Sequence, residues 1–174
     1  MPETMPHAVA TDTIRLNKLV RASRERVFEA WTNPDQLAVW FAPDADTTCN
    51  DVTIEPRVGG TFRFCMTSSN GKHTGGGKFT VFDPPNVLAY TWSWEEQPDF
   101  GADSLVTIEL HEAENPYDEG QPATEVILTH ERLKTAVERS EHTGGWWGAL
   151  RGLGFYVRGV DPKTAMSGAS SVAG

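Results

Sequence analysis

The sequence is poor in cysteine and in basic residues. Its 174 residues include only two cysteines, Cys49 and Cys65, too few for a disulfide framework or for a zinc site built from thiolates. Lys and Arg together number 15 against 24 Asp and Glu, which gives a formal net charge of −9. This balance argues against a protein that binds nucleic acid or an anionic membrane surface, because either task needs a basic face.

Long apolar runs are also missing. No stretch reaches the roughly 20 apolar residues that a membrane-spanning helix needs, and residues 1–12 lack the basic and apolar segments of a secretory signal. We therefore expect a soluble, cytoplasmic domain in which Cys49 and Cys65 are free thiols. The two cysteines flank a predicted hairpin around residues 56–60, and the register of its strands decides whether they face the same side.

Motifs that bind nucleotides or metals, or that carry a nucleophilic serine, are not found. The run 71–78 contains four glycines, but a phosphate-binding loop would need a glycine where Lys72 stands and Ser or Thr where Phe79 stands. We interpret this run as a glycine-rich hairpin loop. The sequence therefore predicts no metal, no cofactor and no catalytic residues.

The composition predicts one domain with two loose ends. Residues 1–11 and 160–174 are rich in small and polar residues, and we expect flexible tails there. The domain between them, 12–159, has no internal repeat and no long linker.

The hydrophobic period of the domain changes twice along the chain. A strand at 13–20 precedes two short helices, for which Ser23 and Asn33 are suited as N-caps, and Gln36 stands where a capping box has Glu or Gln. Alternating apolar residues then predict six more strands, at 49–55, 60–67, 78–82, 87–94, 104–110 and 124–132. Short turns join these strands, which makes neighbours antiparallel.

A long helix is predicted at the end of the domain, over 135–158. One apolar stripe runs along it, formed by Trp146, Leu150, Leu153 and Val157. A second face carries Gly145, Gly148 and Gly152, and allows the close approach of another element or of a ligand. The predicted fold class is α+β, with a curved antiparallel sheet of about seven strands wrapped on this helix and two short helices after the first strand.

Several short motifs, in this order and spacing, give the chain a family resemblance. They are residues 20–23, 27–34, 37–43, 58–64, 83–88, 90–92, 129–131 and 145–146. The sequence resembles the bacterial branch of the START-like (SRPBCC) superfamily, homologues of the activator of the 90-kDa heat-shock-protein ATPase. The resemblance covers residues 13–158 and implies the helix-grip fold, in which the sheet and the long helix enclose a cavity for an apolar ligand.

Large aromatic residues on one face of the sheet are the candidate ligand site. Tyr90, Trp92 and Trp94 alternate along one predicted strand, so their rings share a face. Such rings either fill a solid core or line a pocket, and the resemblance favours the pocket. The expected ligand-binding residues are Trp40, Phe41, Phe62, Phe64, Tyr90, Trp92, Trp94, Ile108, His130, Trp146 and Leu150. Among them we expect Phe41 to gate the pocket, Trp40 to anchor the core, and His130 to be hydrogen-bonded without a catalytic role.

Three functions follow from these observations. The favoured one is a non-catalytic binding or carrier domain for a small hydrophobic or aromatic molecule, because no catalytic constellation stands out. The resemblance also permits an enzyme of the polyketide cyclase or aromatase type, for which His130 or Tyr90 would have to supply acid–base chemistry inside the pocket. The third, which only the resemblance implies, is a co-chaperone that stimulates a heat-shock ATPase. The expected partner is a small ligand, with a heat-shock protein or a second copy of the chain as alternatives.

Overall fold

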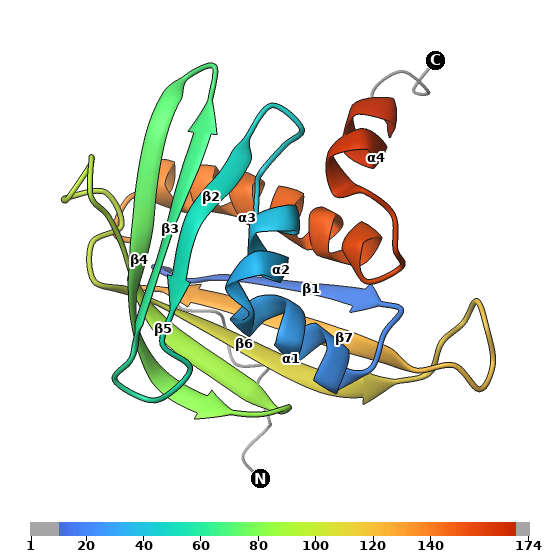
Figure 1. The fold of residues 1–174 in the computed structure, drawn as a ribbon. Helices are drawn as coiled ribbons and strands as arrows, with labels where there is room; N and C mark the ends of the chain where they lie inside the picture. Colours follow the sequence, from blue (N-terminus) through green and yellow to red (C-terminus); the bar gives the residue numbers. More distant parts are fainter. Residues whose placement is uncertain (1–10, 170–174) are drawn as a thin grey trace, which may run out of the picture.

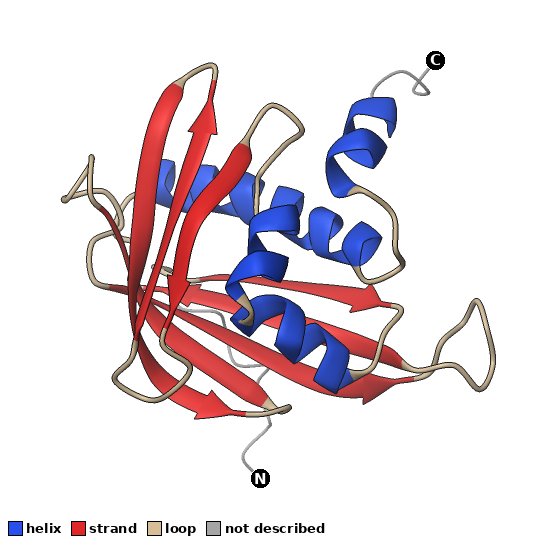
Figure 2. Cartoon of the chain, in the orientation of Figure 1, coloured by secondary structure: helices blue, strands red, loops and turns tan. Residues whose placement is uncertain are grey.

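Within residues 11–169, the fold is made of one antiparallel sheet and four helices (Figures 1 and 2). The computed structural model describes residues 11–169. Its elements are β1 (Ile14–Val20), α1 (Arg24–Thr32), α2 (Pro34–Trp40), β2 (Thr48–Ile54), β3 (Thr61–Ser68), β4 (Gly71–Asp83), β5 (Val87–Trp94), β6 (Ser104–Ala113), β7 (Ala123–Glu131), α3 (Ala136–Tyr156) and α4 (Pro162–Ala169). The predicted α+β helix-grip class is confirmed.

The sheet has the strand order β1-β7-β6-β5-β4-β3-β2, and every neighbouring pair is antiparallel. Figure 1 shows that it curves strongly, so that β2–β4 stand at a steep angle to β5–β7. The helices lie on its concave side, where α3 crosses behind the strands. Among residues 11–169, no helix is long and apolar enough to cross a membrane.

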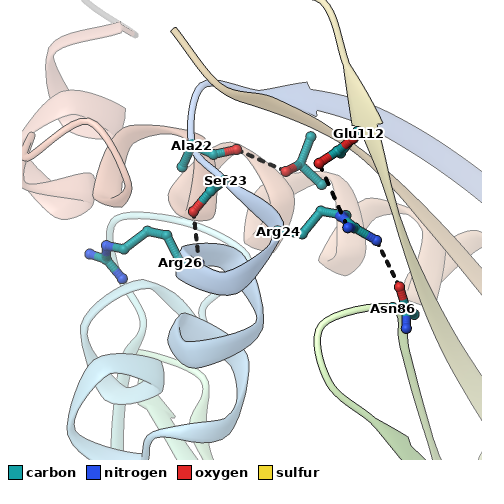
Figure 3. Close-up of polar contacts among 7 residues, drawn as sticks. Ala22, Ser23, Arg24, Arg26, Asn86 and Glu112 are labelled. Carbon is teal, nitrogen blue, oxygen red and sulfur yellow. Dashed lines mark hydrogen bonds and ion pairs between the residues drawn. The ribbon is translucent and has the colours of Figure 1, made fainter.

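The two short helices begin at the predicted caps. The Ser23 hydroxyl accepts a hydrogen bond from the backbone N–H three residues later, at 3.2 Å (Figure 3). The next residue, Arg24, ties α1 to the sheet, since its guanidinium donates to Asn86 at 2.7 Å and lies 3.7 Å from a Glu112 carboxylate oxygen (Figure 3). Asn33 caps α2 by accepting from two backbone N–H groups. The Gln36 side chain, however, binds Arg26 and Glu29 and does not complete a capping box.

Two glycines let α3 approach the end of α2 closely. A Cβ atom on Gly148 would lie 1.8 Å from the carbonyl oxygen of Pro43, and one on Gly152 would lie 2.6 Å from that of Trp40. The third glycine of the predicted face, Gly145, has nothing within 4 Å of such an atom. The close approach predicted for this face is therefore made by the α2 terminus at two positions and is left open at the third.

One sequence expectation needs correction. The run 71–77 is the first half of strand β4 and not a loop. Its glycines fit there because β3 and β5 approach too closely for side chains: a Cβ on Gly77 would lie 2.0 Å from the Thr91 carbonyl oxygen. Residues 162–169 of the expected C-terminal tail form helix α4, where the Asp161 carboxylate accepts from the Lys163 N–H and the Thr164 hydroxyl. The flexibility of this tail stays a prediction. The expected N-terminal tail falls outside the described residues, apart from residue 11.

The register of β2 and β3 places the two cysteines on opposite faces of the sheet. Cys49 pairs with Met66, and Asn50 pairs with Cys65, so Cys49 shares the concave face with Met66 while Cys65 points away from it. Both thiols are free and buried. Burial, with a smaller contribution from Cys65, raises the pKa of Cys49 to about 12.

Candidate functional site

A cavity of about 320 Å³ lies between the first half of α3 and the ends of β3, β4 and β5. This volume falls at the lower end of the range for small-molecule sites. It is lined by Phe41, Pro43, Asp44, Thr47, Met66, Ser68, Asn70, His73, Trp92, Trp94, Gln97, Phe100, Glu141, His142, Gly145, Trp146 and Ala149. The inner wall is therefore aromatic, and the polar side chains come from α3, from the connecting segments and from strand ends.

The structure divides the expected ligand-binding residues into two groups. Phe41, Trp92, Trp94 and Trp146 line the cavity. The others are buried away from it: Trp40, Phe62, Phe64, Tyr90, Ile108, His130 and Leu150. Their side chains pack the solid part of the core, where for example the Trp40 indole N–H donates to the Ala30 carbonyl at 3.0 Å. Trp40 thus holds α2 against α1, in keeping with its expected anchoring role.

Trp92 is the centre of the aromatic wall. Its ring centroid lies 5.1 Å from those of Phe64 and Trp146, 5.3 Å from that of Trp94 and 6.3 Å from that of Phe41. These separations are typical of favourable aromatic pairs. The indole N–H of Trp92 is buried and has no hydrogen-bond partner among residues 11–169. A buried donor without a partner is costly, so this N–H is a weak point of the core packing.

Phe41 is both a wall of this cavity and a core residue. Only 1% of its surface is exposed, and its ring contacts those of Trp40, Phe62, Phe64, Trp92 and Trp146. A side chain held on so many sides stands at the inner end of the cavity rather than at its mouth. The expected gating role therefore has to be weighed against a structural one.

His142 lies in the cavity wall with both ring nitrogens occupied. Nδ1 is 2.7 Å from the Glu138 carbonyl oxygen, which only accepts, and the Trp94 indole N–H donates to Nε2 at 3.1 Å. The hydrogen is thus on Nδ1, and the ring is neutral. Burial lowers the pKa of His142 despite the opposing effect of the Glu138 carbonyl. The Phe100 ring stacks on the imidazole at 5.3 Å and covers it from the side of the β5–β6 loop.

A second histidine, His130, supports the wall from behind. The Trp146 indole N–H donates to its Nδ1 at 3.0 Å, and Nε2–H then donates to the Ser104 hydroxyl at 2.7 Å. Ser104 in turn donates to the Gly101 carbonyl at 2.6 Å. His130 is fully buried, and burial lowers its pKa to about 2. This series of hydrogen bonds fixes the orientation of the Trp146 ring, and His130 is hydrogen-bonded as expected.

Glu138 holds the β5–β6 loop against the start of α3. One of its carboxylate oxygens accepts from the Thr135 backbone N–H at 2.8 Å, which completes a capping box, and the other accepts from the N–H of Gly101. Burial alone would raise the pKa of Glu138, but these backbone donors outweigh it and the net shift is downward. The loop that carries Phe100 is therefore attached to the helix that carries His142.

Sequence reasoning missed His142, Phe100 and Met66 as cavity residues. His142 stands four residues before Trp146, so extending the apolar stripe of the predicted helix by one turn would have included it. No comparable signal marks Phe100, which comes from an irregular loop. Within residues 11–169, no three His, Cys, Asp or Glu side chains form a group that could hold a metal ion.

Comparison with known proteins agrees with this architecture. The family model for Activator of Hsp90 ATPase homolog 1-like proteins matches residues 21–158, which include both short helices, six of the seven strands and all of α3. The chain belongs to this family. Its START-like resemblance, inferred above from the motifs, is thereby confirmed. No curated protein matches the chain.

Solved structures show the same fold at low sequence identity. A protein from Chromobacterium violaceum is 27% identical with a TM-score of 0.69, and the match covers 84% of this chain and 96% of that one. The AHSA1 protein of Silicibacter pomeroyi is 22% identical with a TM-score of 0.68, over 82% and 94% of the two chains. DynU16, a protein of the dynemicin biosynthetic locus, is 18% identical with a TM-score of 0.66, over 87% of this chain and 49% of its own.

Proposed function

We propose that this family member binds a small aromatic or hydrophobic molecule in the cavity between α3 and the sheet. The observation that carries the proposal is a cavity of about 320 Å³ with three indole rings in its wall, beside the buried core. Ligand sites are concave and are lined mainly by aromatic and other apolar side chains, with a few polar groups that orient the ligand. This lining is suited to a planar ligand that carries a polar substituent.

The position of Gly145 provides a clean test of this proposal. It lines the cavity, and a Cβ atom there would meet nothing within 4 Å. Gly145→Leu should therefore fill the cavity without a clash. Gly144→Leu is the matched control, since its Cβ also meets nothing within 4 Å but Gly144 does not line the cavity. Both changes remove a helix-interior glycine, so both should leave the stability equal or slightly higher.

The measurement is a titration with N-phenyl-1-naphthylamine, a neutral fluorescent aromatic. We expect one site per chain, quenching of tryptophan fluorescence, and at least tenfold weaker binding to Gly145→Leu than to Gly144→Leu or to the unchanged protein. Equal binding to all three proteins, or no binding to the unchanged protein, would refute the proposal. Circular dichroism of both variants confirms that the fold is retained.

A cyclase-like enzyme is the second candidate, favoured by the fold shared with DynU16 and by the position of His142. The two side chains expected to act as acid or base, His130 and Tyr90, are fully buried and do not line the cavity. His142 does line it, but Trp94 occupies its free nitrogen. Catalysis would therefore require a substrate hydroxyl to replace the Trp94 N–H. Loss of product formation in His142→Gln with unchanged ligand affinity would support this candidate. Stimulation of a heat-shock ATPase stays a prediction from the family alone.

A further inference from the structure

We infer that the cavity selects aromatic molecules carrying a positive charge and discriminates against those carrying an acidic group. This inference rests on the proposed function and specifies the class of ligand. The charges around the cavity carry the argument. Asp44 and Glu141 line it, and neither Lys nor Arg is among its lining residues. The His142 imidazole in its wall is held neutral by its two hydrogen bonds.

The two carboxylates reach the cavity from different elements. Asp44 follows α2, where its carboxylate accepts from the backbone N–H and the hydroxyl of Thr47, at 3.0 and 2.8 Å. Glu141 is on α3, one turn before Gly145. Both side chains are exposed at the surface beside the cavity. Lys163 shares a smaller neighbouring cavity with Asp44 but donates there to Thr48 and does not line this one.

The aromatic wall strengthens the preference for a cation. Trp92, Trp94 and Trp146 present indole rings to the same space, and indole is the side chain whose π face attracts a cation most strongly. A carboxylate or sulfonate on the ligand would lie near two like charges, those of Asp44 and Glu141. It would find no Lys or Arg among the lining residues to pair with. A fatty acid is thus a poor occupant by this reasoning, and an aromatic amine is a good one.

Three probes with one fluorophore isolate the effect of charge. Each carries a dansyl group on a five-carbon chain, which ends in an ammonium group in dansylcadaverine, in a methyl group in N-hexyl dansylamide and in a carboxylate in dansyl-6-aminohexanoate. The three probes are compared at pH 8, above the ordinary pKa of an imidazole. In low salt we expect the ammonium probe to bind roughly tenfold more tightly than the carboxylate probe, and the ratio to shrink in 0.5 M NaCl.

Charge-neutralising variants assign the selectivity to the cavity. Asp44→Asn keeps the oxygen that accepts from Thr47, and Glu141→Gln changes a side chain of the same length. The double variant should bring the affinity ratio between the ammonium and carboxylate probes close to one, with little change for the neutral probe. The double variant Asp118→Asn with Glu119→Gln is the control, because it changes the net charge equally in an exposed segment that does not line the cavity. It should keep the ratio.

The outcomes separate this inference from the proposed function. If the neutral probe binds in the cavity but the three probes have equal affinities, or the carboxylate probe binds best, the selectivity is refuted and the binding function stands. If the control variant abolishes the ratio as strongly as the cavity variant does, the effect belongs to the net charge and the inference is refuted. If none of the probes binds, the proposed function fails as well.

Discussion

Truncation of Phe41 tests whether the inner wall of the cavity is structural. Phe41 is 1% exposed and in contact with five aromatic rings, the nearest with its centroid at 5.0 Å. Phe→Ala changes in such surroundings lower the free energy of unfolding by about 3–5 kcal/mol, a sum of the lost transfer free energy of the ring and the cost of the cavity left behind. For a domain of this size the melting temperature should fall by about 6–20 °C. We therefore expect Phe41→Ala to be strongly destabilised.

The assay is urea unfolding followed by tryptophan fluorescence, with the slope m compared between variants to check that the transition stays two-state. Val39→Ala is the control, from the last turn of helix α2, which Phe41 caps: Val39 is 50% exposed, so its truncation should change the free energy of unfolding by less than about 0.5 kcal/mol. A loss below about 1 kcal/mol in Phe41→Ala, together with weaker probe binding, would refute this reasoning. It would restore the gating role expected from the sequence.

Three further predictions concern groups outside the cavity. Because burial raises the pKa of Cys49 to about 12, the native protein should react slowly with thiol reagents at pH 8 but yield two free thiols on unreduced unfolding, and recovery of none would demonstrate a disulfide. The pKa of His130 is about 2 in the folded state against about 6.5 in the unfolded state, so the unfolded state binds an extra proton and stability falls as the pH drops below 6.5. This histidine alone should lower the free energy of unfolding by about 2 kcal/mol between pH 8 and pH 5, and urea unfolding of His130→Gln should show a shallower pH dependence over that range. Gly148→Ala should destabilise by about 1–3 kcal/mol because its Cβ would lie 1.8 Å from the Pro43 carbonyl oxygen, whereas Gly144→Ala should stabilise by about 1 kcal/mol in the same thermal-unfolding assay.

Local sequence signals determined the order of the elements. The caps at Ser23 and Asn33 fix where α1 and α2 begin, because a side-chain oxygen satisfies backbone N–H groups whatever lies around it. The alternation of apolar residues likewise identified the strands and the concave face of β5, since a strand has only two faces. The stripe through Trp146 and Leu150 identified the buried face of α3. These features depend on neighbours in the chain, which the sequence shows directly.

The location of the cavity was decided by the tertiary structure alone. Tyr90, Trp92 and Trp94 share one face of β5, yet Tyr90 is buried in the solid core while the other two line the open space. The alternation of side chains along a strand shows which face of the sheet a residue lies on. It does not show whether that part of the face is covered by packed core or by open space. The same limit applies to residues 71–77, whose strand conformation depends on how closely β3 and β5 approach. It also applies to His142, whose Nε2 accepts from the Trp94 indole N–H, 48 residues away in the chain.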